Sequence, residues 1–278
     1  MIKTTRQLKD KINNLSGGNA EKAQTLFRNY MMERFLERVS LSEYKNKFIL
    51  KGGMLVASLV GLDMRATMDI DSTVTALNLS VEEAKNVVKS IINIMIEDNV
   101  SFETTDAETI MDEFDYPGVR IKLNAYFENS RQPIKLDIST GDVITPSAVH
   151  YEYPLMFEDR TISVMSYNIE TLLAEKLQTI MVRAETNTRM RDFYDVYIIS
   201  KNEEINYDDL AAAFAATCKA RNSENQISDI IEIYSAVAES EAMKKQWDNY
   251  KSRNFYVGDV SWKTVTDVCK ELILKITA

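Results

Sequence analysis

The sequence contains few of the residues that crosslink or interrupt a chain. Its 278 residues include only 2 cysteines, 4 prolines, 8 glycines and 1 histidine. Cys218 and Cys269 fall in segments of helical pattern and lack CxxC spacing, so the sequence predicts reduced thiols and neither a disulfide framework nor a zinc site. The single histidine, His150, has no cysteine or G-x-S-x-G partner motif, so covalent catalysis by a triad is not supported.

Long apolar runs and an excess of positive charge are also absent. No stretch reaches the roughly eighteen apolar residues of a membrane span, and residues 1–20 lack the apolar core of a signal peptide. We therefore expect a cytoplasmic protein without membrane contact. The formal net charge of −9 excludes a surface that binds nucleic acid over its whole extent, because phosphate affinity comes from accumulated Lys and Arg. A focused basic cleft remains compatible with this charge.

The first part of the chain mixes helical and strand patterns. Residues 20–40 have the spacing of an amphipathic helix, preceded by a shorter helix. The segment "KFILKGG" predicts a buried strand and a glycine turn, "MLVASLVG" a helix, and "ATMDIDSTVTAL" (66–77) another strand. A helix is predicted over 81–98, after Ser80 as N-cap and with Met95 on its apolar face. Residues 100–165 show β-favouring runs, which predict hairpin-connected strands.

Helical periodicity returns after residue 166. It predicts helices over 168–183, 190–201, 207–221, 224–248 and 261–276. The fold class is therefore α+β. We expect a catalytic domain of mixed sheet and helices over residues 1–160 and a helical bundle over 161–278. No Pro-rich or Gly-rich linker separates the two parts, which favours tight packing around a shared ligand cleft.

Two glycines and two aspartates stand close together in "KGGMLVASLVGLDMRATMDIDSTV" (51–74). Strand residues two apart share a face, so Asp69 and Asp71 present neighbouring carboxylates while Ile70 points into the core. Two unpaired carboxylates repel each other, and Mg²⁺, which binds carboxylates together with substrate phosphates, removes the repulsion. Gly52 and Gly53 permit close backbone approach and open a helix whose free N–H groups suit phosphate.

Together these features predict a site for a metal ion and a triphosphate. Asp137, in the β-patterned segment "IKLDIS", is a candidate third metal ligand, provided that its segment lies beside the strand of Asp69 and Asp71. Neither the Gly-Gly pair nor Asp-x-Asp is specific alone, since both occur in ordinary turns and surface strands. The prediction depends on their order and spacing.

Four segments in order, "LKGGMLVASL", "RATMDID", "ETLLAEKLQTI" and "RMRDFYDVY", resemble the AbiEii/MenT-type family of nucleotidyltransferase toxins. The resemblance covers about residues 48 to 200. It implies a nucleotidyltransferase fold in a bacterial toxin–antitoxin or phage-abortive system. It also implies these roles: Gly52 and Gly53 as the first motif, Asp69 and Asp71 as the metal pair, Lys176 and Asp192 as the third and fourth motifs, and Lys51, Arg65 and Thr67 as nucleotide-binding residues. The chain departs from the superfamily at Met54, where Ser or Thr is common, so the phosphate cradle would rely on backbone N–H groups.

The third and fourth segments also have a physical interpretation. Lys176 and Arg183 lie two turns apart on one predicted helix, and a cationic side there would neutralise phosphates. Asp192 and Asp195 share a helix face, so either one can orient Lys176 or Arg183 through a salt bridge. An ordinary solvated helix face and a structural ion pair are the alternatives that the residues leave open.

The reaction that the resemblance implies is Mg²⁺-dependent transfer of a nucleotide from an NTP to an RNA acceptor, tRNA in some members of the family. A hydroxyl of the acceptor attacks the α-phosphorus and pyrophosphate leaves. A cognate antitoxin, with or without direct contact, is the other implied partner. Two alternatives remain: a metal-dependent glycosyltransferase that uses a nucleotide sugar, and a nucleotide-binding protein without catalysis.

Overall fold

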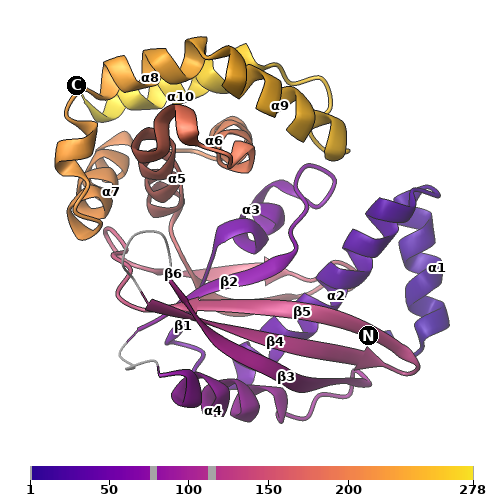
Figure 1. Cartoon of the computed structure of the whole chain (residues 1–278). Helices are drawn as coiled ribbons and strands as arrows, with labels where there is room; N and C mark the ends of the chain where they lie inside the picture. Colours follow the sequence, from indigo (N-terminus) through magenta and orange to yellow (C-terminus); the bar gives the residue numbers. More distant parts are fainter. Residues whose placement is uncertain (1, 76–79, 112–116, 278) are drawn as a thin grey trace. The chain divides into compact units, whose positions relative to one another are not determined.

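A computed structural model describes residues 2–75, 80–111 and 117–277 of the chain (Figure 1). The structure is of the mixed α+β class, as the sequence predicts. It divides into two compact units. The first consists of Met1–Ser58, Ala66–Asp142 and Val149–Ser166, and the second of Leu59–Arg65, Val143–Ala148 and Tyr167–Ala278.

A seven-stranded mixed sheet forms the first unit, with the strand order β3-β4-β5-β2-β1-β7-β6. The strands are β1 (Phe48–Lys51), β2 (Asp69–Val74), β3 (Val100–Met111), β4 (Pro117–Phe127), β5 (Ser130–Ser139), β6 (Val149–Pro154) and β7 (Thr161–Ser166). Strands β3, β4 and β5 are antiparallel neighbours, which confirms the predicted hairpins. Strand β2 is antiparallel to β1 and parallel to β5, so its residues have neighbours on both sides. It is shorter than the predicted strand 66–77, of which residues 76 and 77 lie outside the described residues.

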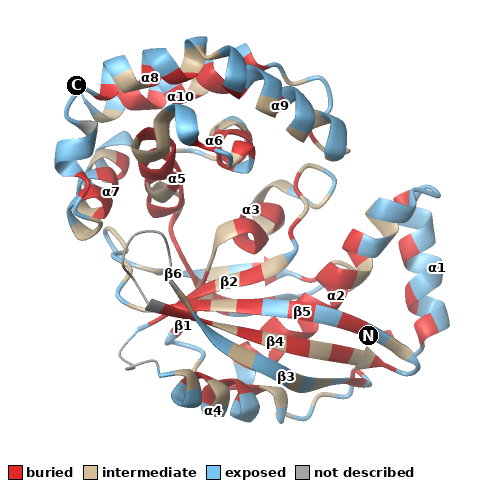
Figure 2. Cartoon of the chain, in the orientation of Figure 1, coloured by how far each residue is buried: buried red, intermediate tan, exposed pale blue. Residues whose placement is uncertain are grey.

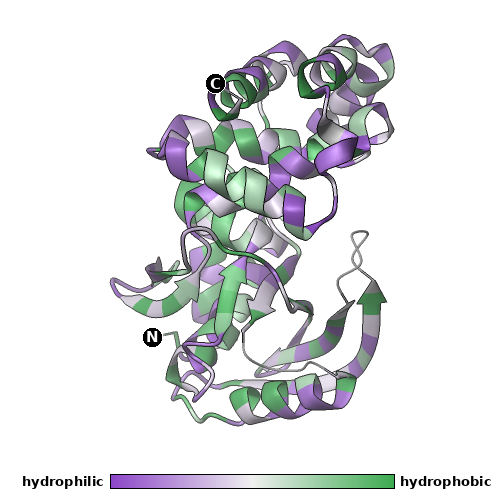
Figure 3. Ribbon diagram, turned by 90° about the vertical axis from the view of Figure 1, so that its left-hand side faces the viewer, coloured by the Kyte–Doolittle hydropathy of each residue, from purple (hydrophilic) through white to green (hydrophobic). Residues whose placement is uncertain are grey.

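The two faces of the sheet differ in polarity. Along residues 119–127 of β4 and 131–138 of β5, every second residue is buried and the residues between them are partly or fully exposed (Figure 2). Figure 3 shows the same alternation as hydropathy along the strands. The buried face packs against helices α2 (Ala20–Leu41) and α4 (Val81–Ile92). Because residues two apart share a face, the polar side chains of these strands gather on the opposite face.

Helix α4 begins as the sequence predicts and ends six residues earlier. Ser80 and Glu83 form a reciprocal capping box at its N-terminus, since each side chain accepts the backbone N–H of the other. The helix ends at Ile92 rather than at residue 98, and Met95, expected on the apolar face, is 92% exposed. The chain turns here because Asp98 is fixed by an ion pair to Arg38 before β3 begins.

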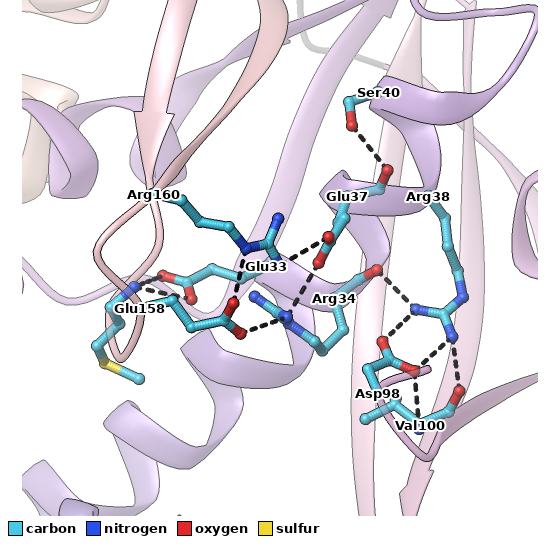
Figure 4. A network of polar contacts seen from close by, with 10 residues as sticks. Glu33, Arg34, Glu37, Arg38, Ser40, Asp98, Val100, Glu158 and Arg160 are labelled. Atoms are coloured by element: carbon cyan, nitrogen blue, oxygen red, sulfur yellow. Dashed lines mark hydrogen bonds and ion pairs between the residues drawn. The ribbon is translucent and has the colours of Figure 1, made fainter. Parts of the chain in front are cut away.

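Helix α2 follows the shorter α1 (Thr5–Ser16) and is buried on nearly all sides over its second half, unlike the amphipathic helix predicted for 20–40. Its burial is compatible with charge because the charged side chains are paired (Figure 4). Arg38 donates to both carboxylate oxygens of Asp98, at 2.7 and 3.0 Å, and to the backbone oxygens of Arg34 and Val100. Both Nη groups of this buried guanidinium are therefore satisfied, whereas its Nε has no hydrogen-bond partner among the described residues.

The remaining charges on α2 connect it to the hairpin between β6 and β7. Arg34 pairs with Glu37 at 2.9 Å and with Glu158 at 3.1 Å, and Arg160 pairs with the same two glutamates. Glu33 accepts the backbone N–H of Met156 and the side-chain amide of Asn29. Hydrophobic periodicity indicates the helix but not its burial, because the polar residues of α2 face protein instead of water.

The second unit is helical, as predicted for the chain after residue 166. Its helices are α5 (Ile169–Arg183), α6 (Met190–Asn202), α7 (Tyr207–Ala220), α8 (Ile230–Glu239), α9 (Glu241–Arg253) and α10 (Trp262–Ile276), with 3₁₀ turns at Ala184–Thr186 and Glu224–Ile227. The helix predicted over 224–248 is in fact split between α8 and α9. Ser240 adopts an extended conformation there, and the indole N–H of Trp262 donates to the backbone oxygen of Ala238 at the end of α8. None of the helices in the described ranges is long and apolar enough to span a membrane.

Candidate functional site

Strand β2 presents the two aspartates as its alternation predicts. Ile70 is fully buried, whereas Asp69 and Asp71 are partly exposed on the polar face. The parallel register places Asp71 directly opposite Asp137 on β5, and the antiparallel register places it opposite Lys51 on β1. The structure therefore brings together the three carboxylates that the sequence singles out.

The turn between β1 and helix α3 (Gly52–Val60) is fitted to Asp71. Gly52 has a φ of 63°, in the left-handed region, and a Cβ built on it would overlap the Asp71 carboxylate, with 2.6 Å to the Asp71 Cβ. Only glycine fits both the backbone angle and the space. The N–H of Gly53 donates to Oδ2 of Asp71 at 3.2 Å. In this structure the N–H of Gly53 thus holds the Asp71 carboxylate and does not point to solvent.

Asp137 is paired with Arg120, a residue that sequence reasoning missed. Arg120 lies on β4 directly opposite Asp137, and its Nε and Nη2 donate to the two carboxylate oxygens at 2.8 and 2.7 Å. This is the bidentate geometry of a strong guanidinium–carboxylate pair. Both oxygens of the candidate third ligand are therefore occupied by an arginine.

The electrostatic environment of Asp69 mixes both signs of charge. Burial raises the pKa of its carboxyl above the ordinary value; Lys135 and Arg120 lower it, and Asp71 and Asp137 raise it. Asp69 also acts on Arg28 of α2, whose pKa is lowered by burial and raised by this carboxylate. A divalent cation beside Asp69 would favour its ionised form, because it adds positive charge where carboxylates are crowded.

Lys51 and Thr67, which the resemblance assigns to nucleotide binding, are held within the first unit. The Nζ of Lys51 lies 2.5 Å from Oδ2 of Asp142, which also accepts the hydroxyl of Ser139 at 2.6 Å. The hydroxyl of Thr67 donates to the backbone oxygen of Asp69 at 3.2 Å. Asp142 is a second residue that the sequence did not indicate, since it follows a glycine in a loop without any motif.

The donor set suits a hard divalent cation that arrives with its substrate. Asp69 and Asp71 supply oxygen ligands on one face, and the glycine turn allows the backbone to approach them. Throughout the described residues, no group of three or more His, Cys, Asp or Glu side chains is placed to hold a metal ion by itself. Magnesium commonly completes its shell with substrate phosphate oxygens and water, so two carboxylates fit such an ion.

The second unit contains a separate buried charge cluster. Lys176 of α5 contacts Asp195 of α6 at 2.6 Å and Asp192 at 3.4 Å. Arg65 donates through Nε to Oδ1 of Asp195 at 2.5 Å and through Nη2 to Oδ2 at 3.2 Å. The structure thus brings together Lys176, Asp192 and Arg65 from three segments distant in sequence, and Asp195 joins them.

Asp195 is the centre of this cluster. Burial would raise the pKa of its carboxyl, but Arg65 and Lys176 outweigh burial and hold the pKa well below the usual range. The motif resemblance favoured Asp192, while the geometry gives Asp195 the shorter contact to Lys176 and both contacts to Arg65. Arg183 lies in the last turn of α5, seven residues or roughly 10 Å of helix from Lys176. Its role in nucleotide binding stays a prediction.

Comparison with known families identifies the chain. The model of the family described as nucleotidyl transferase AbiEii toxin, type IV toxin–antitoxin system, matches residues 34–267. This range includes the glycine turn, both aspartates of β2 and the Lys176 cluster. A search of curated proteins found no match.

One solved structure shows the same fold at low sequence identity, and a second is similar at a lower TM-score. A crystal structure of a candidate nucleotidyltransferase from H. pylori is 18% identical, has a TM-score of 0.50, and the match covers 91% of this chain and 94% of that one. The crystal structure of JHP933 from Helicobacter pylori, also 18% identical, has a TM-score of 0.47 over 90% and 94% of the two chains. Because the family model matches most of the sequence, this chain belongs to the AbiEii nucleotidyltransferase toxin family of type IV toxin–antitoxin systems, and its fold agrees with that assignment.

Proposed function

We propose that this toxin transfers a nucleotide from an NTP to an RNA acceptor in a Mg²⁺-dependent reaction. The observation that carries the proposal is the pairing of Asp69 and Asp71 on one face of β2, with Asp71 held by the N–H of Gly53. This arrangement offers two oxygen ligands beside a turn that admits phosphate. The cognate antitoxin that the family implies is the partner that restrains the activity.

Each residue of the first unit has a distinct task in this proposal. Asp69 and Asp71 bind the ion, and Gly52 keeps the space next to Asp71 free of a side chain. Lys51, opposite Asp71, adds positive charge at the edge of the carboxylates. When bound, the magnesium ion stabilises negative charge on the triphosphate and favours ionisation of the attacking hydroxyl.

The reaction itself requires no covalent enzyme intermediate. The oxygen of an acceptor hydroxyl bonds to the α-phosphorus, the bond from the α-phosphorus to the bridging oxygen breaks, and pyrophosphate leaves with that oxygen. The hydroxyl proton passes to a base, for which the carboxylates of β2 and β5 are the candidates. Lys176 and Asp192 are the third-motif lysine and the fourth-motif acid that the resemblance implies, and the pairing of Lys176 with Asp192 and Asp195 supports the proposal that these acids orient the lysine.

The proposal predicts that label from an NTP enters RNA only while the β2 carboxylates are intact. The purified protein is incubated with each α-labelled NTP in turn, Mg²⁺ and total cellular RNA, and RNA-bound label is measured. We expect Asp71→Asn to lose on the order of a hundredfold or more in rate, since it removes one anionic metal ligand. Asp106→Asn is the matched control, because Asp106 is an exposed carboxylate on β3 paired with Lys122.

Two outcomes would overturn the proposal. The first is a lack of incorporation with every NTP and every RNA pool, in protein that is folded by circular dichroism. The second is turnover of a nucleotide sugar without NTP incorporation, which would favour the glycosyltransferase alternative. If EDTA abolishes transfer and Mg²⁺ restores it, the metal dependence is supported independently of the mutations.

A further inference from the structure

A row of five charged residues of both signs crosses the polar face of the sheet at the level of Asp71. Strand register aligns Lys51 of β1, Asp71 of β2, Asp137 of β5, Arg120 of β4 and Glu108 of β3 as successive neighbours. Adjacent strands lie about 4.8 Å apart, so the two carboxylates in the middle of the row are close neighbours. Asp69 lies two residues from Asp71 on the same face and adds a third acidic group.

Arg120 neutralises one of these acids in a specific way. It uses a two-pronged contact that occupies both oxygens of Asp137, at 2.8 and 2.7 Å. Each oxygen keeps a second lone pair, but the guanidinium orients Asp137 toward β4 and places a positive charge beside it. A metal ion therefore competes with Arg120 for Asp137. The same arginine also acts electrostatically on Asp69, so a single cation is shared by two of the three acids.

This pair is more accessible than the other ion pairs of the site. The side chains of Arg120 and Asp137 are 32% and 19% exposed, compared with 13% and 6% for Lys51 and Asp142. A partly solvated pair, even a bidentate one, exchanges partners at a lower cost than a buried pair, because water replaces the lost contacts. Buried pairs do not exchange readily, since an uncompensated charge would remain in the interior.

We infer that Arg120 is a positioning residue that holds Asp137 away from the metal and releases it when the metal and triphosphate bind. The inference rests on the proposed function. Once released, the guanidinium is free to pair with phosphate oxygens, which match its planar fork as well as a carboxylate does. The ion and the arginine thus compete for Asp137, and binding of the substrate decides the competition.

The test measures the affinity for Mn²⁺ alone, followed by electron paramagnetic resonance of the free ion, with no nucleotide present. We expect Arg120→Gln to bind Mn²⁺ about fivefold more tightly than the unsubstituted protein, because Asp137 is then available. The gain should vanish in the double variant Arg120→Gln with Asp137→Asn. Lys122→Gln is the matched control: it removes the same charge from the same face of β4, but its partners are Asp106 and Glu108.

An equal gain in Mn²⁺ affinity in Arg120→Gln and Lys122→Gln would show that the effect comes from net charge alone, and it would overturn the inference. Unchanged or weaker Mn²⁺ binding in Arg120→Gln would overturn it as well. A second measurement uses transfer: release of Arg120 onto phosphate predicts that Arg120→Gln raises KM for the NTP more than it lowers kcat. Because Mn²⁺ binding is measured without substrate, failure of the proposed reaction and failure of the inference give different results.

Discussion

At the scale of single residues, Gly52 determines both the conformation of the turn after β1 and the position of the Asp71 carboxylate. Glycine is needed at this position for two reasons. Its φ lies in the left-handed region, and a side chain there would overlap the Asp71 carboxylate. A side chain there would either push Asp71 away from Asp69 or force the turn to a different angle. Both changes would alter the spacing of the Asp69 and Asp71 carboxylates, the proposed metal ligands.

We therefore predict that Gly52→Ala lowers kcat/KM for nucleotide transfer by at least about tenfold, because displaced ligands cost transition-state stabilisation. Gly17→Ala is the control. Gly17 has a similar φ of 57°, but a Cβ there meets nothing within 4 Å. It should lose only the stability expected for a left-handed alanine, about 1 kcal/mol by thermal unfolding, and keep its activity. Equal loss of activity in both variants would contradict this account.

Part of the site could be predicted from sequence at this scale, and the reason is local. Asp69, Ile70 and Asp71 follow from strand alternation alone, and the glycines follow from their order before a helix. Arg120 could not be predicted, because its importance arises from a partner on another strand. Helical spacing did indicate Asp195 as a possible partner of Lys176, but its contact with Arg65 depends on a distant segment. In "VRIKLNAYF" the alternation places Arg120 on the polar face, but only the register with β5 pairs it with Asp137.

At the scale of elements, α2 differs most from its prediction. Twelve consecutive residues from Arg28 to Val39 are buried, and four of the charged ones take part in the network of Figure 4. The pattern of apolar residues correctly indicated a helix over 20–40, because periodicity reports backbone spacing. It could not indicate full burial, which depends on Asp98, Glu158 and Arg160 from distant segments.

Glu33 gives this helix a measurable pH dependence. Burial raises the pKa of its carboxyl from 4.5 to about 8, partly opposed by Arg34 and by the hydrogen bonds from Met156 and Asn29. The folded chain therefore retains a proton that the unfolded chain releases between about pH 4.5 and pH 8. A group of this kind makes the folded state less stable as pH rises through that window, by up to about 1.4 kcal/mol per pH unit, and has no further effect above it.

We predict that Glu33→Gln removes this contribution, so that the free energy of unfolding falls less between about pH 5 and pH 8 than in the unsubstituted protein. Urea unfolding followed by circular dichroism at several pH values measures the difference. Glu43→Gln, which alters an exposed glutamate just after α2, is the control and should leave the slope unchanged. Identical slopes for all three proteins would show that Glu33 is ionised in the fold.

The ends of the helices were the other errors at this scale. Helix α4 stops at Ile92 and α8 stops at Glu239, in both cases before the helical pattern of the sequence ends. In each case a distant side chain fixes the break, Arg38 through Asp98 and Trp262 through the backbone oxygen of Ala238. Such contacts leave no pattern in the local sequence. Helix ends that depend on tertiary structure therefore cannot be predicted from it.

At the scale of the whole molecule, the sequence correctly indicated the α+β class and the change from mixed to helical pattern. It also indicated unpaired thiols, and the structure shows both cysteines free and buried. Burial raises the pKa of Cys218 to about 11 and that of Cys269 to about 12. Thiols of this kind are protonated at neutral pH and react poorly with electrophiles.

We predict that the folded protein resists alkylation by iodoacetamide near neutral pH, and that both thiols react once urea unfolds it. Intact-mass spectrometry over time gives the number of modified thiols. The denatured protein provides the upper limit. Rapid modification of either cysteine in the absence of urea would show that its helix opens far below the global unfolding transition.

Cys218 on α7 and Cys269 on α10 share the second unit with Trp247 and Trp262, the chain's two tryptophans. Indole emission and thiol chemistry therefore report on the helices and give no direct signal from the sheet that carries Asp69 and Asp71. A melting curve recorded by tryptophan fluorescence reports the surroundings of Trp247 on α9 and Trp262 on α10, not those of the strands. To follow the carboxylate-bearing half, an experimenter must introduce a fluorophore into it.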